Sequence, residues 1–512
     1  MLRDYAFQEL SDFDREVYQM VVPQEHFLNG ALAMLPWDEF SDVLVPYYSV
    51  DQGRPALKPV QMLKLEYLRY HYNLSDREVI KRAETDLAFR QFLQIPLRFP
   101  LPDASSLCVF RGRLGVEGFR KVFDRVVQTA REHGFVKDRL RIKDATHVIG
   151  KMAIPTALTL VAQTRDKLLD ATESFAEVMV TGERVNLELL REATKKLAPN
   201  ERLVTRLAQL SEMLVWVDQV TPPTDPDNDR LWQKFLNQRD LSHKILGDQE
   251  QPGSGDQTIS TTDPDARRGK HGQFYNGYLV DLIVDADSAI ITQLNVLPAN
   301  GNEGFDAIEL LEREQAAHGN RVQAISIDGA GYSGPLLRQL QDPTGLNVEA
   351  FVPVPAVGVD EKFTLEDFTF NAEENTFTCP AGVTSSSVSY SPENQTTRYR
   401  FRAKDCRECP LLKRCMSKPP ATVGRTVCRS DYLAEHQQAK QKTKTAAYQA
   451  VRQEHPQVER KLGEVMNRHG GRHARYFGQA KVLIQETMAG MATNVKRIVK
   501  LACAPIELQL TN

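Results

Sequence analysis

The chain has 512 residues, of which 41% are apolar and 26% charged, and this composition is that of an ordinary globular protein. The length predicts two to four domains, because a single hydrophobic core rarely serves more than about 300 residues. The formal net charge is −3, which excludes a protein that attracts nucleic acid through a strongly basic overall field. Any contact with nucleic acid must therefore come from local basic patches.

The sequence gives no sign of a membrane or of secretion. No apolar run approaches the length that spans a bilayer, so no membrane contact is expected. The first residues lack a basic stretch followed by an apolar core, so we expect no signal peptide and a cytoplasmic location. Of the seven Cys, four lie between Cys379 and Cys415. In a reducing compartment such clustering favours metal binding or free thiols over disulfides.

Short helices are predicted for the first hundred residues. Apolar residues recur at helical spacing over residues 59–72. Ser75 and Glu78 are spaced as a capping box, in which each side chain accepts a hydrogen bond from the backbone of the other.

A helix with a basic face is predicted after residue 102. Val109, Phe110 and Leu114 would lie on one face, and Arg111 and Arg113 on another. Short capped helices with exposed arginines suit a helix-turn-helix that reads DNA. The alternative is an ordinary helical bundle with a solvated charged face, which the pattern alone favours.

The middle of the chain mixes strands and helices. Residues 140–149 alternate apolar and polar side chains like a strand, long charged helices follow over 155–246, and a loop is expected over 247–272. Beyond it we expect strands at 278–284 and 290–296, a helix at 303–318, a strand at 322–327, a helix from 334 and a strand at 347–354. This order predicts a mixed α/β core with one large helical insertion. Residues 357–429 are expected to be irregular, and the chain from 432 onward helical.

Three carboxylates stand in contexts that suit metal-assisted phosphodiester chemistry, which uses converging carboxylates to hold two divalent ions about 4 Å apart. Asp144 lies inside an apolar strand, where a charge is costly unless it is bound or paired. Asp328 ends a strand and precedes Gly329, at the carboxyl end of a sheet where α/β active sites collect. Glu459 lies near the start of a helix. The alternatives are a strand-edge Asp facing water, a turn-forming Asp and a solvated helix Glu.

These residues resemble, in chain order, the three carboxylate motifs of DDE transposases of bacterial insertion sequences. The motifs are Asp144-Ala145-Thr146-His147, Ile327-Asp328-Gly329-Ala330-Gly331-Tyr332 and Val458-Glu459-Arg460-Lys461-Leu462-Gly463. Supporting stretches are Thr262-Asp263-Pro264-Asp265-Ala266-Arg267 with Gly277-Tyr278, then Asn73-Leu74-Ser75-Asp76-Arg77-Glu78 and Pro102-Asp103-Ala104-Ser105. The chain is similar in particular to the insertion-sequence group numbered eleven-eighty-two, from about Tyr48 to Lys500.

The resemblance implies an α/β fold, with an RNase H-like mixed-sheet catalytic core that carries a large helical insertion and follows an all-α N-terminal DNA-binding domain. Asp144 would lie on the first strand, Asp328 at the end of the fourth and Glu459 on the closing helix, and together they would hold Mg²⁺ or Mn²⁺. The implied parts are the N-terminal domain 1–135, the core 136–154 with 273–356, the helical insertion and loop 155–272, the Cys-rich insertion 357–430 and the C-terminal helices 431–512.

The implied activity is metal-dependent cleavage at transposon inverted repeats and strand transfer into target DNA. The implied partner is double-stranded DNA, bound by a homodimer on paired ends, at the nucleoid of a bacterial cytoplasm. One alternative is an RNase H-like nuclease without strand transfer. Another is a domesticated DNA-binding protein without catalysis.

The third motif departs from the pattern of its relatives. They often carry a basic residue four before the Glu and a Lys seven after it, where this chain has His455 and Met466. Glu464, one turn further along the same helix, is the alternative to Glu459.

Arginines surround the third motif. Arg452 and Arg468 could take over the missing basic roles, and Arg472 and Arg475 follow in a loop with Gly470. Arginines beside a metal–carboxylate site can clamp a phosphate backbone. With Arg111 and Arg113 they form the predicted DNA-binding set, and the alternative for the loop is a solvated helix end.

Four cysteines in the segment before the last helices could bind zinc. Cys406 and Cys409 have the spacing of a zinc knuckle, and Cys379 and Cys415 flank them singly. They could hold a structural Zn²⁺ in a segment too short for a core of its own. The alternative is a cluster of reduced thiols.

Overall fold

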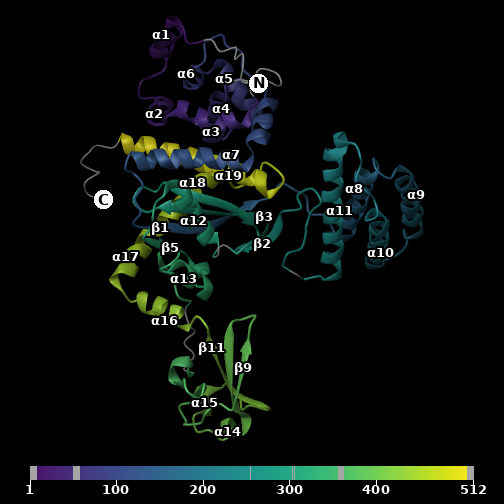
Figure 1. Cartoon of the computed structure of the whole chain (residues 1–512), viewed down its shortest axis with the longest axis vertical. Helices are drawn as coiled ribbons and strands as arrows, with labels where there is room; N and C mark the ends of the chain where they lie inside the picture. The colour runs from purple at the N-terminus through teal and green to yellow at the C-terminus, as the bar shows by residue number, and fades with distance from the viewer. Residues whose placement is uncertain are drawn as a thin grey trace.

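The computed structural model describes residues 9–49, 58–253, 255–302, 304, 306–355 and 362–503. The N-terminal residues on which the signal-peptide expectation rests, 1–8, lie outside this range. Figure 1 shows a central sheet with helices above it, a lobe of helices to the right and a small β-rich lobe below. No helix in the described ranges has the length and apolar character needed to cross a bilayer.

The N-terminal part is helical, as predicted. Its helices are α1 (Asp12–Val21), α2 (Phe27–Met34), α3 (Phe40–Leu44), α4 (Pro59–His71), α5 (Asp76–Thr85) and α6 (Leu87–Leu93). The capping box is confirmed: the Glu78 amide donates to Ser75 Oγ at 3.2 Å, and the Ser75 amide donates to the Glu78 carboxylate at 2.7 Å. α4 is buried from Pro59 to Tyr70, so it is the central helix of this part.

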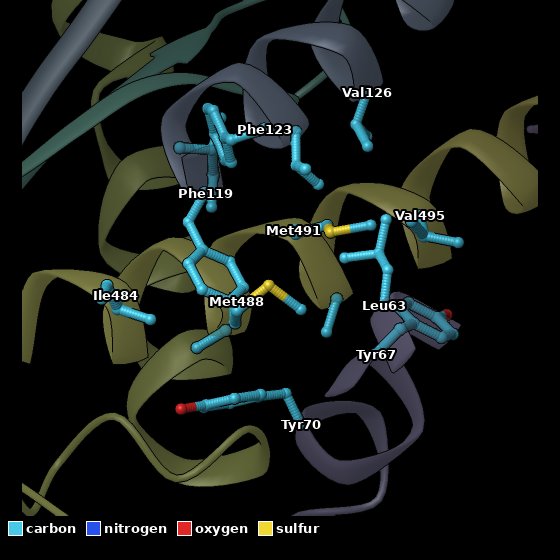
Figure 2. Packing of buried hydrophobic residues seen from close by; sticks show 14 of the residues in the cluster. Leu63, Tyr67, Tyr70, Phe119, Phe123, Val126, Ile484, Met488, Met491 and Val495 are labelled. Carbon is cyan, nitrogen blue, oxygen red and sulfur yellow. The ribbon is translucent and has the colours of Figure 1, made fainter. Parts of the chain in front are cut away.

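Two long helices form the floor beneath these short ones. They are α7 (Ser105–Glu132), broken at Gly115 where φ is +58°, and α19 (Gln479–Ala502). Figure 2 shows them packing together with α4 through Leu63, Tyr67, Tyr70, Phe119, Phe123, Val126, Ile484, Met488, Met491 and Val495. Val109, expected on the apolar face of α7, is instead 58% exposed. It lies about 100° around the helix from the buried Phe110, on the solvent side.

The central sheet is mixed and contains six strands in the described residues. They are β1 (Arg141–Ile149), β2 (Arg267–His271), β3 (Gln273–Asp285), β4 (Ile291–Pro298), β5 (Ala324–Ser326) and β6 (Glu349–Phe351). The order is β2-β3-β1-β5-β6, with β4 also paired to β3. β3 runs antiparallel to β1, β2 and β4, whereas β5 is parallel to both β1 and β6.

The predicted strands are confirmed, but some of their boundaries differ from the prediction. All five predicted strands are present, and β5 and β6 are shorter than expected. The expectation of a loop throughout 247–272 is wrong, because β2 forms a hairpin with β3 across Gly272. Its sequence, Arg267-Arg268-Gly269-Lys270-His271, lacks the apolar alternation that signals a strand.

The two faces of the sheet are covered by different helices. Ile142 and Val148 of β1 belong to the large core that includes α18 (Pro456–Arg468) and α19. Ile283 and Ile325 belong to a second core with α12 (Asp306–His318) and α13 (Gly334–Leu340). This division follows from the alternation of side chains along each strand.

The face toward α12 also holds a buried ionic network from β1. Arg141 donates to Asp285 at 2.8 Å and to Glu314 at 2.7 Å, and Lys143 pairs with Asp281. All five side chains are at most 1% exposed. The basic residues of β1 thus form buried ion pairs, on the face of the sheet opposite to Asp144.

The helical insertion between β1 and β2 is present. It consists of α8 (Ala157–Thr172), α9 (Glu177–Ala193), α10 (Pro199–Val217) and α11 (Asp229–Glu250). These helices bury a cluster of their own, which includes Val161, Leu210 and Phe235.

The expectation of irregular structure over 357–429 is wrong. The segment forms β7 (Thr369–Asn371), β8 (Thr376–Thr378), β9 (Ser387–Ser391), β10 (Thr396–Arg402) and β11 (Val423–Ser430), with short helices α14 (Ala403–Arg407) and α15 (Leu412–Cys415). Strands of three to eight residues with many Thr, Ser and Arg side chains give only a weak sequence signal. The rest of the C-terminal part is helical as predicted, with α16 (Leu433–Lys442) and α17 (Ala446–Glu454) leading into α18 and α19.

Candidate active site

Two of the predicted carboxylates are aligned by the register of β1 and β5. In this parallel pair, Arg141 lies opposite Ile325 and Ile142 lies opposite Ser326. Asp144 and Asp328 each come two residues further along, so the same register brings them to one level. Neighbouring strands lie about 5 Å apart, and residues two apart in a strand point to one face. We therefore expect the two carboxylates at neighbouring positions on the face of the sheet that carries Ile142 and Ser326.

Helix α18 covers this face. At its start, Nδ1 of His455 lies 3.0 Å from Ser326 Oγ. Past its end, Arg472 donates to Thr146 Oγ1 at 3.4 Å and to the His147 carbonyl at 2.7 Å. Ser326 pairs with Ile142, so along β1 Asp144 lies between the level of the His455 contact and Thr146. It is on the same face of the sheet as these residues and therefore faces α18.

Glu459 lies at the level of Asp144. α18 runs in the direction of β1, because its start is beside Ser326 and the chain beyond its end bridges Ile149. Asp144 lies two residues beyond Ile142, a rise of about 7 Å along a strand. Glu459 lies four residues beyond His455, a rise of about 6 Å along a helix. Glu459 is exposed, whereas Val458 beside it is buried.

Each aspartate accepts a hydrogen bond from a backbone amide close to it in sequence. Asp144 Oδ1 accepts from the Ala145 amide at 2.8 Å, and Asp328 Oδ1 accepts from the Ala330 amide at 3.0 Å. Both residues are half-buried. A carboxylate keeps acceptor capacity after one such bond. As they stand, no three His, Cys, Asp or Glu side chains in the described residues form a group that could hold a metal ion, so the three carboxylates share a level without closing into such a group.

Glu464, the alternative to Glu459, has a structural role. Its carboxylate accepts from Lys496 at 2.6 Å and from Lys461 at 3.0 Å. Burial raises the pKa of Glu464, but the hydrogen bond from Lys496 and the charge of Lys461 outweigh that effect and lower the pKa to about 2. The side chain thus joins α18 to α19, which leaves Glu459 as the carboxylate of this helix on the solvent side.

Two of the predicted arginines contact the strands of the site. Arg452 donates through Nη1 to Ser326 Oγ at 3.2 Å and to the Ile327 carbonyl at 3.1 Å, next to Asp328. Arg472 contacts Thr146, as described above. Arg468 is exposed in the last turn of α18, whereas Glu459 lies in the first turn.

The remaining arginines differ in setting. Arg475 donates to the Leu74 carbonyl at 2.8 Å, which ties the loop after α18 to the N-terminal helices. Arg113 is exposed, with its guanidinium 4.3 Å from the ring of Tyr48.

The expectation that Arg111 is exposed is wrong. The residue is 7% exposed. Its guanidinium pairs with the buried Glu66 and donates to Asp76 at 3.1 Å. The charge of Arg111 is used to neutralise carboxylates of α4 and α5, which argues against a contact of this side chain with DNA.

Two family models match the chain. Residues 16–113 match the Transposase domain (DUF772), and residues 378–499 match the Transposase DDE domain. Together these matches support a DDE-type transposase. A DDE domain implies a nuclease or transposase enzyme, and a transposase binds DNA. No solved structure matches the chain.

The matched ranges include part of the candidate site. The first spans the capped turn before α5, and the second spans Glu459 with the arginines of α17, α18 and the following loop. Asp144 and Asp328 lie between the two ranges, so their placement comes from strand register alone.

An open groove of about 790 Å³ lies where these ranges meet. Its walls are the turn before α5, the end of β1 and the loop after α18. Arg77, Lys151 and His473 are exposed along it, and Arg475 is half-buried. Arg77 and Lys151 were not predicted as DNA contacts, because only the fold brings the turn before α5 and the end of β1 to one groove.

Proposed function

We propose that this chain is a transposase of the insertion-sequence group eleven-eighty-two, which cleaves DNA at inverted repeats and joins the cut ends to target DNA. The observation that carries the proposal is the alignment of Asp144 and Asp328 on neighbouring parallel strands, beneath the helix that bears Glu459. The two transposase-domain matches support the same conclusion.

The proposal includes an RNase H-like core. Its support is the strand order β4-β3-β1-β5-β6, in which the antiparallel strands β4, β3 and β1 lead into two strands parallel to β1. Apart from the short hairpin strand β2, β5 is the fourth strand in chain order. Asp144 is then on the first strand and Asp328 follows the fourth, as the resemblance implies. We also propose the division into domains at about residues 135, 155, 273, 357 and 431.

The donor chemistry of the three residues fits a divalent ion. Carboxylate oxygens are the ligands that Mg²⁺ and Mn²⁺ prefer, and we assign Asp144, Asp328 and Glu459 as the side chains that would hold them. Such ions, when bound, activate the attacking oxygen and stabilise the leaving oxygen. The register of β1 and β5 supports the placement of the two aspartates, and we propose that Glu459 would complete the set from α18.

The side chains of the protein would position DNA at this site. Arg452 uses Nη1 for its contacts with β5, and a guanidinium has further donors on its other two nitrogens. These donors can bind a phosphate beside Asp328. Arg472 and Arg468 would contact the backbone on the other side of Glu459, and Arg475 and Arg113 would do so toward the N-terminal helices.

The proposed reaction consists of two in-line displacements at phosphorus. In the first, water attacks the phosphorus at the end of the element, and the 3′-oxygen leaves to become a 3′-hydroxyl. In the second, that hydroxyl attacks a phosphodiester of the target, whose own 3′-oxygen leaves. Neither step needs a covalent bond to the protein, so one site can serve both. We propose a homodimer that holds two ends together, in the cytoplasm of a bacterium at its nucleoid.

The test is incubation of the purified chain with Mg²⁺, a fragment carrying both ends of the element that encodes it, and a target plasmid. The proposal predicts breaks at the ends and products in which the ends are joined to the plasmid. Breaks without joining would identify a nuclease and contradict strand transfer. Specific binding without breaks would identify a DNA-binding protein without catalysis.

A further inference from the structure

Four cysteines of the small β-rich lobe surround one cavity. Cys379, Cys406, Cys409 and Cys415 all line a space of about 30 Å³. The other lining side chains are mostly apolar: Val383, Phe401, Leu412 and Met416, with Asp405 and Arg425. The remaining cysteines, Cys108, Cys428 and Cys503, are exposed. The fold has therefore gathered four of the five thiols of this lobe around one cavity.

Tight backbone turns deliver these thiols. After Cys379, the Gly382 amide donates to the Cys379 carbonyl at 2.8 Å, and Gly382 adopts a φ of +81°, which favours glycine. In the second turn, the Cys409 amide donates to the Cys406 carbonyl at 3.4 Å. Cys415 ends the short helix α15. Short turns of this kind can place two or more sulfurs around one ion.

The backbone beside Cys406 is shaped around its sulfur. The Arg425 amide points at Cys406 Sγ over 3.5 Å. A Cβ on the preceding Gly424 would come 2.7 Å from that sulfur, so a larger residue there would collide with it. This contact and the absence of a side chain at Gly424 leave room for the sulfur of Cys406 at the wall of the cavity.

The lobe has little else to stabilise it. Its buried apolar cluster is Phe363, Phe368, Phe377, Tyr399, Phe401 and Val427. A core of this size falls short of what an independent fold needs, and small domains commonly add a metal or disulfides.

We propose that Cys379, Cys406, Cys409 and Cys415 hold one structural Zn²⁺ that closes this lobe. As the side chains stand, no three metal-capable groups in the described residues form a ready ligand set. A cysteine sulfur is redirected by rotation about the Cα–Cβ bond between staggered positions, and the proposal is that such rotations bring the four thiols that line the cavity onto one ion. Zinc would then have tetrahedral sulfur ligands at about 2.3 Å.

The zinc proposal is independent of the transposase proposal, so its test measures metal rather than activity. The full chain is purified without chelators and its zinc content is measured by mass spectrometry. We expect one zinc ion per chain, near-complete loss of zinc in Cys409→Ser, and full retention in Cys428→Ser, a matched cysteine on β11 of the same lobe. Zinc well below one per chain in the wild type, or zinc retained after Cys409→Ser, would overturn the proposal.

A second measurement covers the case in which Cys409→Ser fails to fold. Wild-type chain exchanged with Co²⁺ should show the visible bands of a tetrahedral cobalt–thiolate site, and four thiols should become reactive when the metal is removed. Octahedral Co²⁺ spectra, or disulfides among the four cysteines in the freshly purified protein, would show that these residues do not hold zinc.

Discussion

Asp144 and Asp328 each lie two residues beyond Ile142 and Ser326, which pair between the parallel strands β1 and β5. This register predicts one level for both carboxylates, although 328 − 144 = 184 positions of the chain separate them. The pairing of Ile142 with Ser326 sets this level, and His455 at the start of α18 contacts Ser326. The helix that carries Glu459 is therefore anchored to the strand that delivers Asp328. Predictions about the site follow from this anchoring.

Glu459 and Glu464 should separate catalysis from stability. Glu459→Gln should lower metal-dependent cleavage about a hundredfold or more, because a lost metal ligand removes several kcal/mol of transition-state stabilisation, and should leave the melting temperature unchanged. Glu464→Gln loses ion pairs with Lys461 and Lys496, so it should destabilise the fold by about 1 kcal/mol and keep cleavage. Cleavage rates and thermal unfolding of both variants check this. The reverse pattern would show that Glu464 is the catalytic carboxylate.

The groove beside the site should bind DNA phosphates through Arg77 and Lys151. Alanine at both positions should weaken binding to end-bearing DNA and reduce the slope of log Kd against log salt by about 2, because each lost phosphate contact removes about one unit. Fluorescence anisotropy over a range of salt concentrations measures this. Lys404→Ala, an exposed lysine of the distant β-rich lobe, is the control and should leave the slope unchanged. Equal slopes in all variants would place DNA elsewhere.

Arg111 should matter for stability rather than for DNA. Arg111→Ala leaves Glu66 with one cation fewer in a fully buried setting, so it should cost about 3 kcal/mol or more of unfolding free energy. Arg113→Ala, on the exposed side, should change stability by about 0.5 kcal/mol or less. Urea unfolding of both variants compares them. A stable Arg111→Ala protein with weakened DNA binding would restore the interpretation of Arg111 as a DNA contact.

A buried glutamate should make stability depend on pH. Burial raises the pKa of Glu486 to about 8, against the opposing effects of Gln485, Arg475 and Arg472. Its folded pKa lies above the unfolded value, so its contribution to stability is complete below about pH 4.5 and is lost as pH rises through about 8. Glu486→Gln mimics the protonated form. The melting temperature of this variant relative to wild type should rise steadily from pH 5 to pH 8, and a constant difference would contradict the raised pKa.

The sequence predicts the strands that carry the two aspartates of the site. Asp144 stands in an alternating strand and Asp328 follows an apolar one, and both patterns are local. The capping box before α5 is local as well. The alternation of side chains along a strand and the residues of a capping box can both be recognised from neighbouring residues, even where the strand pairs with a distant segment.

The features that were not predicted depend on contacts between distant segments. Arg111 is buried because Glu66 and Asp76 approach it from 45 and 35 positions away. The groove exists because Arg475 joins Leu74 across 401 positions. Helix periodicity identifies the faces of a helix but does not tell which of its charged residues will meet a partner.

Whether Asp144 and Asp328 form one metal-dependent site can be tested by comparing Asp144→Asn and Asp328→Asn with wild type in single-turnover cleavage of end-bearing DNA in Mg²⁺. The same proteins are assayed for end binding in Ca²⁺. If the two aspartates share one site, each substitution should abolish cleavage, both should leave end binding intact, and the double variant should be no worse than either single one. Cleavage by the Asp328→Asn protein at the rate of the wild type would contradict a shared site.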